Sequence, residues 1–374
     1  MEFRDLKKQY EVLKPRIDDA VLQVMGAARY ISGPQVKELE QKLAEYVGVK
    51  HCITCANGTD ALTLALKVWD IKEGDAVFVP DFTFFSTAEV VGLEGATPIF
   101  VDVQDDTYNI NPDELEKAIA RVLSEGKLRP RVIIAVDLFG LPADYNKIRS
   151  IADKYSLYLL EDGAQGFGGA INGKRACSFG DISTTSFFPA KPLGCYGDGG
   201  AVFTDNDEWA SLIRSYAVHG KGADKYDNVR IGLNSRLDTV QAAILQVKLD
   251  AFENYELDSV NQAAKWYDEF LSDTVNKPIV PEGFYSSWAQ YTIQFETVEQ
   301  RDSVQKQLNE KGIPSMIYYR KAMHEEGAFS HIKYEGTCST TERLCKTVLS
   351  LPIHPYLEKS DVEYISEVIN SIRR

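Results

Sequence analysis

Between about residues 34 and 250, helical and strand-like apolar patterns alternate along the chain. Pro34–Val47 repeats its apolar residues every three to four positions, which is typical of a helix packed on one side. The run RVIIAVDL, Arg131–Leu138, is almost entirely apolar, as expected of a strand buried on both faces of a sheet. Such alternation predicts a mostly parallel β-sheet covered by helices.

The same patterns place the individual elements. Helices are expected at Pro34–Val47, Thr59–Trp69, Ser86–Leu93, Pro112–Leu123 and Tyr145–Tyr155. Strands are expected at Cys52–Cys55, Ala76–Pro80, Pro98–Val103, Arg131–Leu138, Leu157–Leu160, Asp181–Ser186 and Ala201–Phe203.

The pattern changes after about residue 250. A long helix is expected at about Leu237–Leu271, followed by strands at Gln290–Phe295 and Ser315–Tyr319 and helices at Val298–Lys311 and Asp361–Ile372. We therefore predict a large α/β domain, residues 1–250, and a smaller α+β domain, residues 251–374.

Charge and hydropathy exclude some classes of protein. The net charge of −14 disfavours binding to nucleic acid or to anionic membranes, because both require a basic surface. No apolar run is long enough to span a bilayer, and the first residues, MEFRDLKK, carry charges where a signal peptide needs an apolar core. These features predict a cytoplasmic protein. At this length the core needs no metal or disulfide, and no metal site is expected.

Cys52 and Cys55 form a CxxC pair, a spacing found in redox and zinc sites. No second CxxC or pair of histidines follows it. Because the pair lies in the apolar run HCITCA, we interpret both cysteines as small core residues.

Several polar residues fall at the expected carboxyl ends of strands, where open α/β sheets bind ligands. Gly58 and Thr59 open a helix, whose free N–H groups favour phosphate, although a simple helix cap fits equally well. Asp162 follows a buried strand and needs a partner, which is either a cationic ligand N–H or, as the alternative, a structural arginine or a helix to cap. Ser186 follows a further strand.

Lys191 lies in SFFPAKPLGCYGDGGA, residues 186–201. Apolar neighbours would desolvate this lysine, lower the pKa of its ammonium group and free an amine for Schiff-base chemistry; an ordinary surface lysine is the alternative. A lysine, an acid and phosphate donors together fit pyridoxal phosphate. Phe84, or failing that Phe82, is the candidate ring to stack on the cofactor.

The chain resembles the DegT/StrS-type sugar-nucleotide aminotransferases, which use pyridoxal phosphate and have fold type I. The resemblance covers nearly the whole chain. It rests on the following segments: FRDLKKQY (3–10), YISGPQVKELE (30–40), CANGTDAL (55–62), DFTFFSTAE (81–89), LLEDGAQGFG (159–168), SFFPAKPLGCYGDGGA (186–201), RIGLNSRLDTVQAAIL (230–245) and SLPIHPYL (350–357).

The resemblance implies roles for these residues. Lys191 would form the Schiff base with the cofactor and move protons, and Asp162 would pair with the pyridinium nitrogen. Gln165 would lie near the ring and its 3-hydroxyl group. The remaining cofactor contacts would be Gly58, Thr59 and Ser186 on the phosphate, Phe84 on the ring, and Asn234, which reaches the phosphate of the other subunit. A homodimer with shared active sites follows from the last role.

The motifs look most like the subgroup that aminates carbon 3 of UDP-2-acetamido-2-deoxy-3-oxo-glucuronate. L-glutamate would be the donor and leave as 2-oxoglutarate, in a ping-pong reaction that supplies diamino uronic acids for bacterial surface polysaccharide such as lipopolysaccharide O-antigen. Arg236 is the candidate cation for the uronate or glutamate carboxylate, with a dimer salt bridge as the alternative.

One segment departs from the family pattern. Tyr318 stands where a histidine is common and Arg320 where a proline is common. Tyr318, Tyr319, Arg320 and His324 are expected to border the sugar.

Three alternatives remain at this stage. The first is amination at carbon 4 or of a dTDP-linked 6-deoxy sugar. The second is a cofactor-binding protein without activity, which the intact Lys191, Asp162 and Ser186 disfavour. The third is an NAD-dependent dehydrogenase, which the absence of a GxGxxG motif disfavours.

Overall fold

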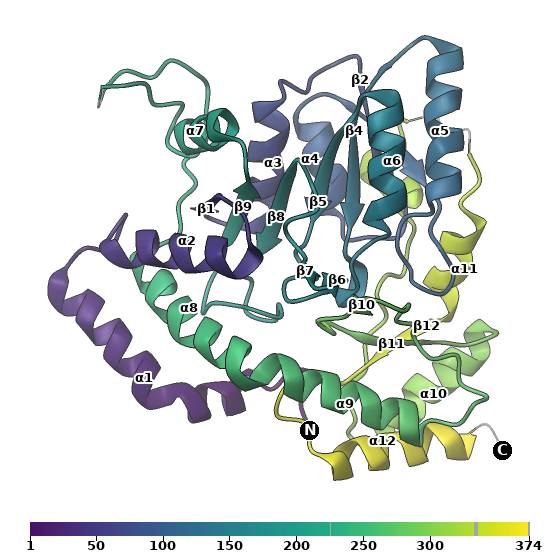
Figure 1. The fold of residues 1–374 in the computed structure, drawn as a ribbon. Coiled ribbons are helices and arrows are strands. Elements are labelled where there is room, and N and C mark those ends of the chain that lie inside the picture. The colour runs from purple at the N-terminus through teal and green to yellow at the C-terminus, as the bar shows by residue number, and fades with distance from the viewer. Residues whose placement is uncertain (225, 333–335, 373–374) are drawn as a thin grey trace.

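The computed structural model describes residues 1–224, 226–332 and 336–372 (Figure 1). Its centre is a seven-stranded sheet of order β1-β9-β8-β5-β4-β2-β3. These strands are β1 (His51–Cys55), β2 (Asp75–Pro80), β3 (Thr97–Val101), β4 (Arg129–Val136), β5 (Tyr158–Asp162), β8 (Ile182–Ser186) and β9 (Gly200–Thr204). Strand β9 runs antiparallel to the other six strands, which share one direction. The prediction of a mostly parallel α/β sheet is confirmed.

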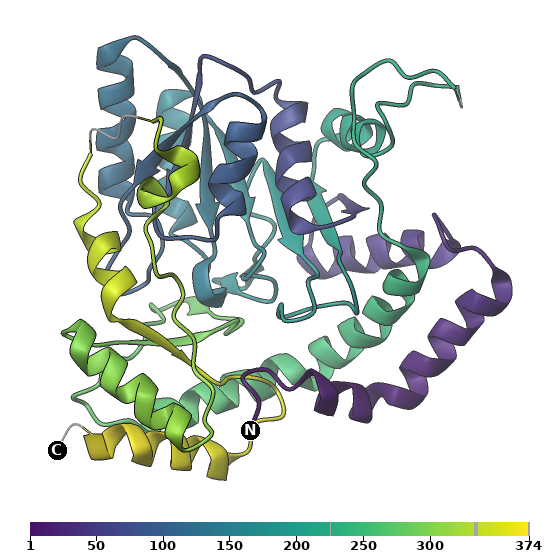
Figure 2. The ribbon, with the colours of Figure 1, turned by 180° about the vertical axis from the view of Figure 1, so that it is seen from behind.

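Helices cover both faces of this sheet (Figures 1 and 2). They are α2 (Pro34–Val47), α3 (Gly58–Val68), α4 (Ser86–Leu93), α5 (Pro112–Glu125), α6 (Tyr145–Tyr155), α7 (Asp207–Tyr216) and α8 (Thr239–Ala251). Strand β2 shows how the layers are built. Val77 and Val79 pack with α3, α4 and α7, whereas Ala76 and Phe78 pack with α5 and α6. Successive side chains of a strand point to opposite faces, so an apolar strand of this kind serves both layers.

The C-terminal part has a core of its own. It comprises α9 (Leu257–Phe270), β11 (Tyr291–Gln294), α10 (Val298–Glu310), α11 (Ser339–Thr347), β12 (Val348–Leu351) and α12 (Lys359–Ile372). One cluster of buried side chains draws only on residues from Val260 to Ile369. The predicted long helix is present as α8, a π-helical turn at Phe252–Glu256, and α9. The short strands β10 (Phe284–Tyr285), β6 (Ala170–Ile171) and β7 (Lys174–Arg175) form a second sheet.

One expected strand is wrong. Ser315–Tyr319 contains a single bridge, between Met316 and Ser350, and forms no strand. Beyond that bridge the chain turns toward the large sheet, where the ring of Tyr319 packs edge-on against Phe82. The side chains of this segment thus follow tertiary contacts rather than a ladder.

The sequence reading also missed the first helix. α1 (Leu6–Ala27) packs along α8 through Leu13, Ile17 and Ile244. The N-terminus lies beside α9 and α12 in both views (Figures 1 and 2). Cys52 and Cys55 are buried free thiols in β1, as expected of core residues. No helix in the described residues is long and apolar enough to cross a bilayer.

Candidate active site

Strand register brings distant polar residues to one edge of the sheet. Gly200, the first residue of β9, pairs with both Cys55 at the end of β1 and Ser186 at the end of β8. Asp162 ends β5 and pairs with Thr184 of β8. The carboxyl ends of β1, β5 and β8 therefore meet, which is where open α/β sheets bind ligands.

The first part of the site is a close approach between Gly58 and Ser186. Gly58 is the first residue of α3, and Asn57 caps this helix by accepting a hydrogen bond of 2.7 Å from the backbone N–H of Asp60. A Cβ atom on Gly58 would lie 2.8 Å from Ser186 Cβ, which is too close. The helix N-terminus, the serine hydroxyl and the adjacent Thr59 thus form a tight cradle suited to a phosphate group.

Asp162 is the buried acid of the site. Its side chain accepts hydrogen bonds from the Thr87 hydroxyl (3.0 Å, on Oδ2) and from the Ala164 backbone N–H (3.2 Å, on Oδ1). Burial raises the pKa of this carboxyl group, while the two hydrogen bonds and the positive charge of Lys191 act to lower it. A cationic ring N–H would compensate the cost of burying this carboxylate.

Lys191 lies in the connection between β8 and β9, where its backbone N–H bonds to Phe188 O over 2.9 Å. Desolvation lowers the pKa of its ammonium group, as does the charge of Arg4, whereas Asp162 acts to raise it. A lowered pKa makes the neutral amine, the nucleophilic form, more accessible near neutral pH.

The aromatic candidates differ in exposure. Phe84 is 54% exposed at the start of α4, whereas Phe82 is 1% exposed and packs in a core with Tyr108 and Phe139. The ring of Phe84 lies 6.4 Å from that of Tyr319. Of the two phenylalanines, Phe84 is the one available to a ligand.

Gln165 connects this edge to the C-terminal part of the chain. Its Oε1 accepts a hydrogen bond from Phe139 N (2.7 Å), and its Nε2 donates to the hydroxyl of Tyr319 (3.0 Å). Tyr318 is half-buried and packs edge-on against Phe3 at 6.3 Å. The two tyrosines thus lie at the site, whereas the neighbouring Arg320 is exposed.

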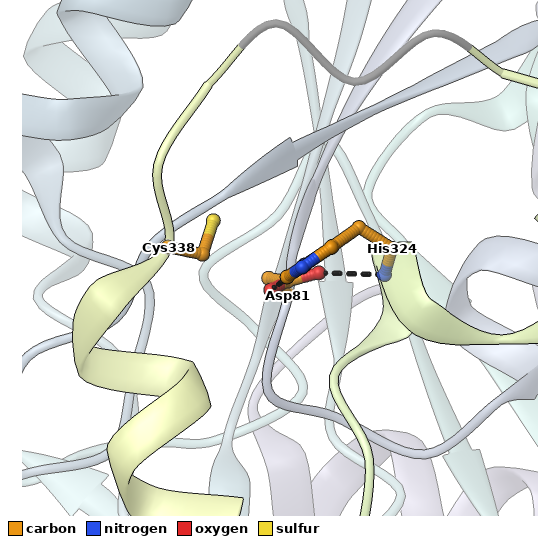
Figure 3. A group of neighbouring side chains, drawn as sticks. All are labelled: Asp81, His324 and Cys338. Atoms are coloured by element: carbon orange, nitrogen blue, oxygen red, sulfur yellow. Dashed lines mark hydrogen bonds and ion pairs between the residues drawn. The ribbon is translucent and has the colours of Figure 1, made fainter.

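His324 is held by Asp81 at the end of β2. Its Nδ1 lies 2.7 Å from Asp81 Oδ2, and its backbone N–H donates to Oδ1 over 2.9 Å. Figure 3 shows the two side chains pointing at one another with Cys338 nearby. The three groups have ligand atoms within 4.8 Å of one another. Asp81 and His324 satisfy each other, so this pair fastens the segment after Tyr319 to the large sheet.

Arg236 and Asn234 contact one another, and Ser235 between them accepts a hydrogen bond of 3.0 Å from Ala56 N. Arg236 lines a surface cavity of about 500 Å³ together with Lys37, Glu40 and Arg214, and its guanidinium donates to Asn234 Oδ1. Gly58, Ser186 and Lys191 do not line this cavity.

Sequence reasoning missed two residues of the site. Thr87, which orients Asp162, and Arg4, which donates to the Lys191 carbonyl oxygen over 2.9 Å, both lie in segments quoted for the family resemblance. Neither residue stands at a strand end, so the pattern of polar residues at strand ends did not point to them.

The residues present fit pyridoxal phosphate. The cradle between Gly58 and Ser186 suits its phosphate, Asp162 has a carboxylate that needs a cationic partner, and Lys191 is desolvated beside it. A mostly parallel α/β sheet with this site at its carboxyl edge defines a pyridoxal-phosphate-dependent enzyme of fold type I.

The chain belongs to the DegT/DnrJ/EryC1/StrS aminotransferase family, whose model matches residues 12–370. It is therefore a pyridoxal-phosphate-dependent aminotransferase.

Individual relatives match over almost their whole length. A UDP-2-acetamido-2-deoxy-3-oxo-D-glucuronate aminotransferase from Pseudomonas aeruginosa is 41% identical over 99% of this chain and 100% of its own. A UDP-N-acetyl-3-dehydro-alpha-D-glucosamine 3-aminotransferase from Acidithiobacillus ferrooxidans is 40% identical, over 98% and 96%. The crystal structure of a family member from Brucella abortus is 50% identical with a TM-score of 0.97, covering 99% of both chains.

Proposed function

We propose that this enzyme transfers the amino group of L-glutamate to the carbon-3 keto group of a UDP-linked 2-acetamido-2-deoxy-3-oxo-uronic acid. The observation that carries the reaction type is the desolvated Lys191 beside the buried Asp162. The full-length similarity to the Pseudomonas aeruginosa enzyme supports the substrate. The product would supply diamino uronic acids for bacterial surface polysaccharide such as O-antigen, made in the cytoplasm.

When bound, pyridoxal phosphate supplies an electron sink that stabilises negative charge on the reacting carbon. Lys191 would hold the cofactor covalently between reactions. When free, its neutral amine would move a proton between the two reacting carbons, a role that the lowered pKa produced by burial favours. Because the enzyme would retain the amino group while 2-oxoglutarate leaves and before the keto-sugar binds, the kinetics are expected to be ping-pong.

Asp162 keeps a proton at the ring nitrogen. Thr87 and the Ala164 N–H fix the orientation of its carboxylate, so Asp162 would meet a bound pyridinium N–H without reorganisation. Gln165 binds near the 3-hydroxyl group and is itself fixed by Phe139 N and Tyr319.

The remaining cofactor contacts follow from the cradle. Gly58, Thr59 and Ser186 bind the phosphate at the start of α3, where the helix dipole adds to the hydrogen bonds. Phe84 would stack on the ring, since its side chain is 54% exposed.

For the sugar we propose contacts from Tyr318, Tyr319, Arg320 and His324. Tyr319 and His324 would act from fixed positions, because each already bonds to the large sheet. Arg320 is exposed and can meet an anionic group of the nucleotide.

We also propose a homodimer in which Asn234 and Arg236 complete the active site of the partner. In support, the segment after α7 projects from the body of the protomer (Figure 1), and large apolar side chains lie exposed on it and on α1, including Ile231 (92%) and Leu22 (68%). Light scattering should give the mass of two chains.

Shared sites have a sharper test. Mixing and refolding the inactive variants Lys191→Ala and Asn234→Ala should restore part of the activity, because each mixed dimer regains one intact site. If mixing restores nothing while both variants dimerise, the sites are not shared.

The substrate itself is tested by product analysis. The enzyme is incubated with L-glutamate and either the 3-keto uronate or a 4-keto UDP-sugar, and the aminated carbon is identified by NMR. Amination at carbon 3 of the uronate is expected. Amination of the 4-keto sugar alone would contradict the proposal.

A further inference from the structure

The N-terminal segment reaches the site through Arg4. Its Nη2 donates hydrogen bonds to the carbonyl oxygens of Lys191 (2.9 Å) and Pro192 (3.4 Å). The neighbouring Phe3 packs edge-on against Tyr318. Two consecutive residues thus contact the lysine segment and the tyrosine expected at the sugar.

The start of α1 holds Arg4 in place. Asp5 caps the helix by accepting a hydrogen bond of 2.7 Å from Lys8 N. One turn later, Gln9 Nε2 lies 2.9 and 3.0 Å from the two carboxylate oxygens of Glu256, a buried residue of the C-terminal half. Arg4 therefore directly precedes the capping residue of a helix that is held in place.

The charge of Arg4 has no close carboxylate partner among the described residues. No carboxylate of the described residues lies within the 4.0 Å of an ion pair with its guanidinium, and Glu256 acts only at longer range. Burial lowers the pKa of Arg4 to about 10. Its charge also acts to lower the pKa of Lys191 and of the buried Lys248. Burying a guanidinium without a carboxylate partner is costly, and a bound anion would offset that cost.

The guanidinium also has donors to spare. Arginine carries five N–H groups, and the hydrogen bonds of Arg4 to described residues all use Nη2. The side chain is partly exposed, and Nε and Nη1 are not among the enclosed polar atoms of the described residues. They can therefore receive an oxygen of a ligand.

We propose that Arg4 is a substrate-binding residue that receives a carboxylate beside Lys191. This inference rests on the proposed function, in which both substrates carry carboxylates: L-glutamate and the uronate. The cofactor phosphate has its own cradle at Gly58 and Ser186, and the exposed Arg320 is proposed for the nucleotide, so a substrate carboxylate is the anion we assign to Arg4. Within the same protomer, Arg236 lines a different cavity.

The test compares Arg4→Gln and Arg4→Lys with the wild type, both loaded with cofactor. Lys7→Gln serves as the charge control, because Lys7 is an exposed neighbour on the same helix. Half-saturation is measured separately for L-glutamate, for the 3-keto uronate and for the matching 3-keto sugar with a neutral C6 hydroxyl group. Binding of glutarate, which cannot react, is followed by calorimetry as a readout independent of turnover.

Arg4→Gln should weaken the binding of at least one carboxylate substrate about 10- to 100-fold, which is the usual loss when a hydrogen bond to a charged group is removed. The neutral sugar should be unaffected, and Arg4→Lys should recover part of the loss. Weaker binding of glutamate and glutarate would show that Arg4 binds the carboxylate of the amino donor. Weaker binding of the uronate alone would show that Arg4 binds the carboxylate of the sugar.

Two results would overturn the proposal. If the half-saturation concentrations of Arg4→Gln for L-glutamate and the uronate both lay within twofold of the wild-type values, Arg4 would bind neither carboxylate. An equal loss for the neutral sugar would show that Arg4 only positions the Lys191 segment. If the wild type aminated no 3-keto sugar, the proposed function would fail, while the glutamate and glutarate measurements would still decide the role of Arg4.

Discussion

The hydroxyl of Thr87 donates a hydrogen bond of 3.0 Å to Oδ2 of Asp162. Thr87 lies on α4 and Asp162 at the end of β5, so a helix on one face of the sheet orients the acid at its edge. The Asp162 carboxylate is thus held from two sides, by this helix and by the backbone N–H of Ala164 in the turn after β5.

Asp162→Asn should leave the fold intact and lower kcat/KM about 10- to 100-fold or more, because a neutral amide cannot hold the ring nitrogen protonated. Thr87→Val, which removes only the hydrogen bond that orients Asp162, should lower kcat/KM by a smaller factor. Steady-state kinetics and thermal unfolding check both variants. Equal activity of Asp162→Asn and wild type would refute the assigned role.

Lys191→Ala should fold and bind pyridoxal phosphate only noncovalently, and its transamination should fall by at least about 10²–10⁴-fold. Borohydride reduction followed by mass spectrometry tests the covalent link. Lys306→Ala, on the exposed surface of α10, is the control and should retain the adduct. An adduct in Lys191→Ala would assign the Schiff base to another lysine.

Gly58→Ala tests the phosphate cradle. The new methyl group would lie 2.8 Å from Ser186 Cβ, so this crowding should cost about 1–3 kcal/mol and weaken cofactor retention. In the control Gly26→Ala, the methyl group of a residue in α1 meets nothing within 4 Å, and up to about 1 kcal/mol of stabilisation is expected. Denaturant unfolding and dialysis of the holoenzyme measure both effects. Full cofactor retention in Gly58→Ala would contradict the cradle.

Substitutions of Phe84 and Phe82 should have different effects, the first on cofactor binding and the second on the stability of the fold. Phe84→Ala should weaken cofactor binding about 2- to 12-fold, the value of one aromatic contact, with little effect on unfolding. Phe82→Ala should cost about 3–5 kcal/mol of unfolding free energy, because its ring is buried. The reverse pattern, measured by cofactor titration and urea unfolding, would exchange the two roles.

The Asp81–His324 pair predicts a pH dependence of stability. The hydrogen bond with Asp81 raises the pKa of His324 above its ordinary value of 6.5. The folded state therefore favours the protonated ring, and this stabilisation is complete below the ordinary value and is lost as pH rises through the raised pKa.

Asp81→Asn should thus cost about 1.5–3 kcal/mol near pH 6 and clearly less near pH 9. Urea unfolding of variant and wild type at both values measures the difference. Lys14→Gln, which removes an exposed ion pair with Asp18, should change little at either pH. A cost of Asp81→Asn that does not vary with pH would mean that His324 stays neutral.

The sequence by itself determined the sheet and most of its helices. Pro34–Val47 and Tyr145–Tyr155 were predicted to the residue, because apolar periodicity and capping residues are local properties. Asp162 and Ser186 could be placed at strand ends for the same reason, and parallel strands bring such ends together. By contrast, Ser315–Tyr319 has a strand-like pattern but is shaped by contacts with the large sheet.

Only the tertiary structure decided which side chains face the site. Phe82 and Phe84 lie two residues apart in the same segment, and the sequence does not distinguish them. Packing buries Phe82 and leaves Phe84 exposed. Arg4 meets Lys191 and His324 meets Asp81 across long stretches of chain. Such contacts depend on how whole elements pack, which no local pattern encodes.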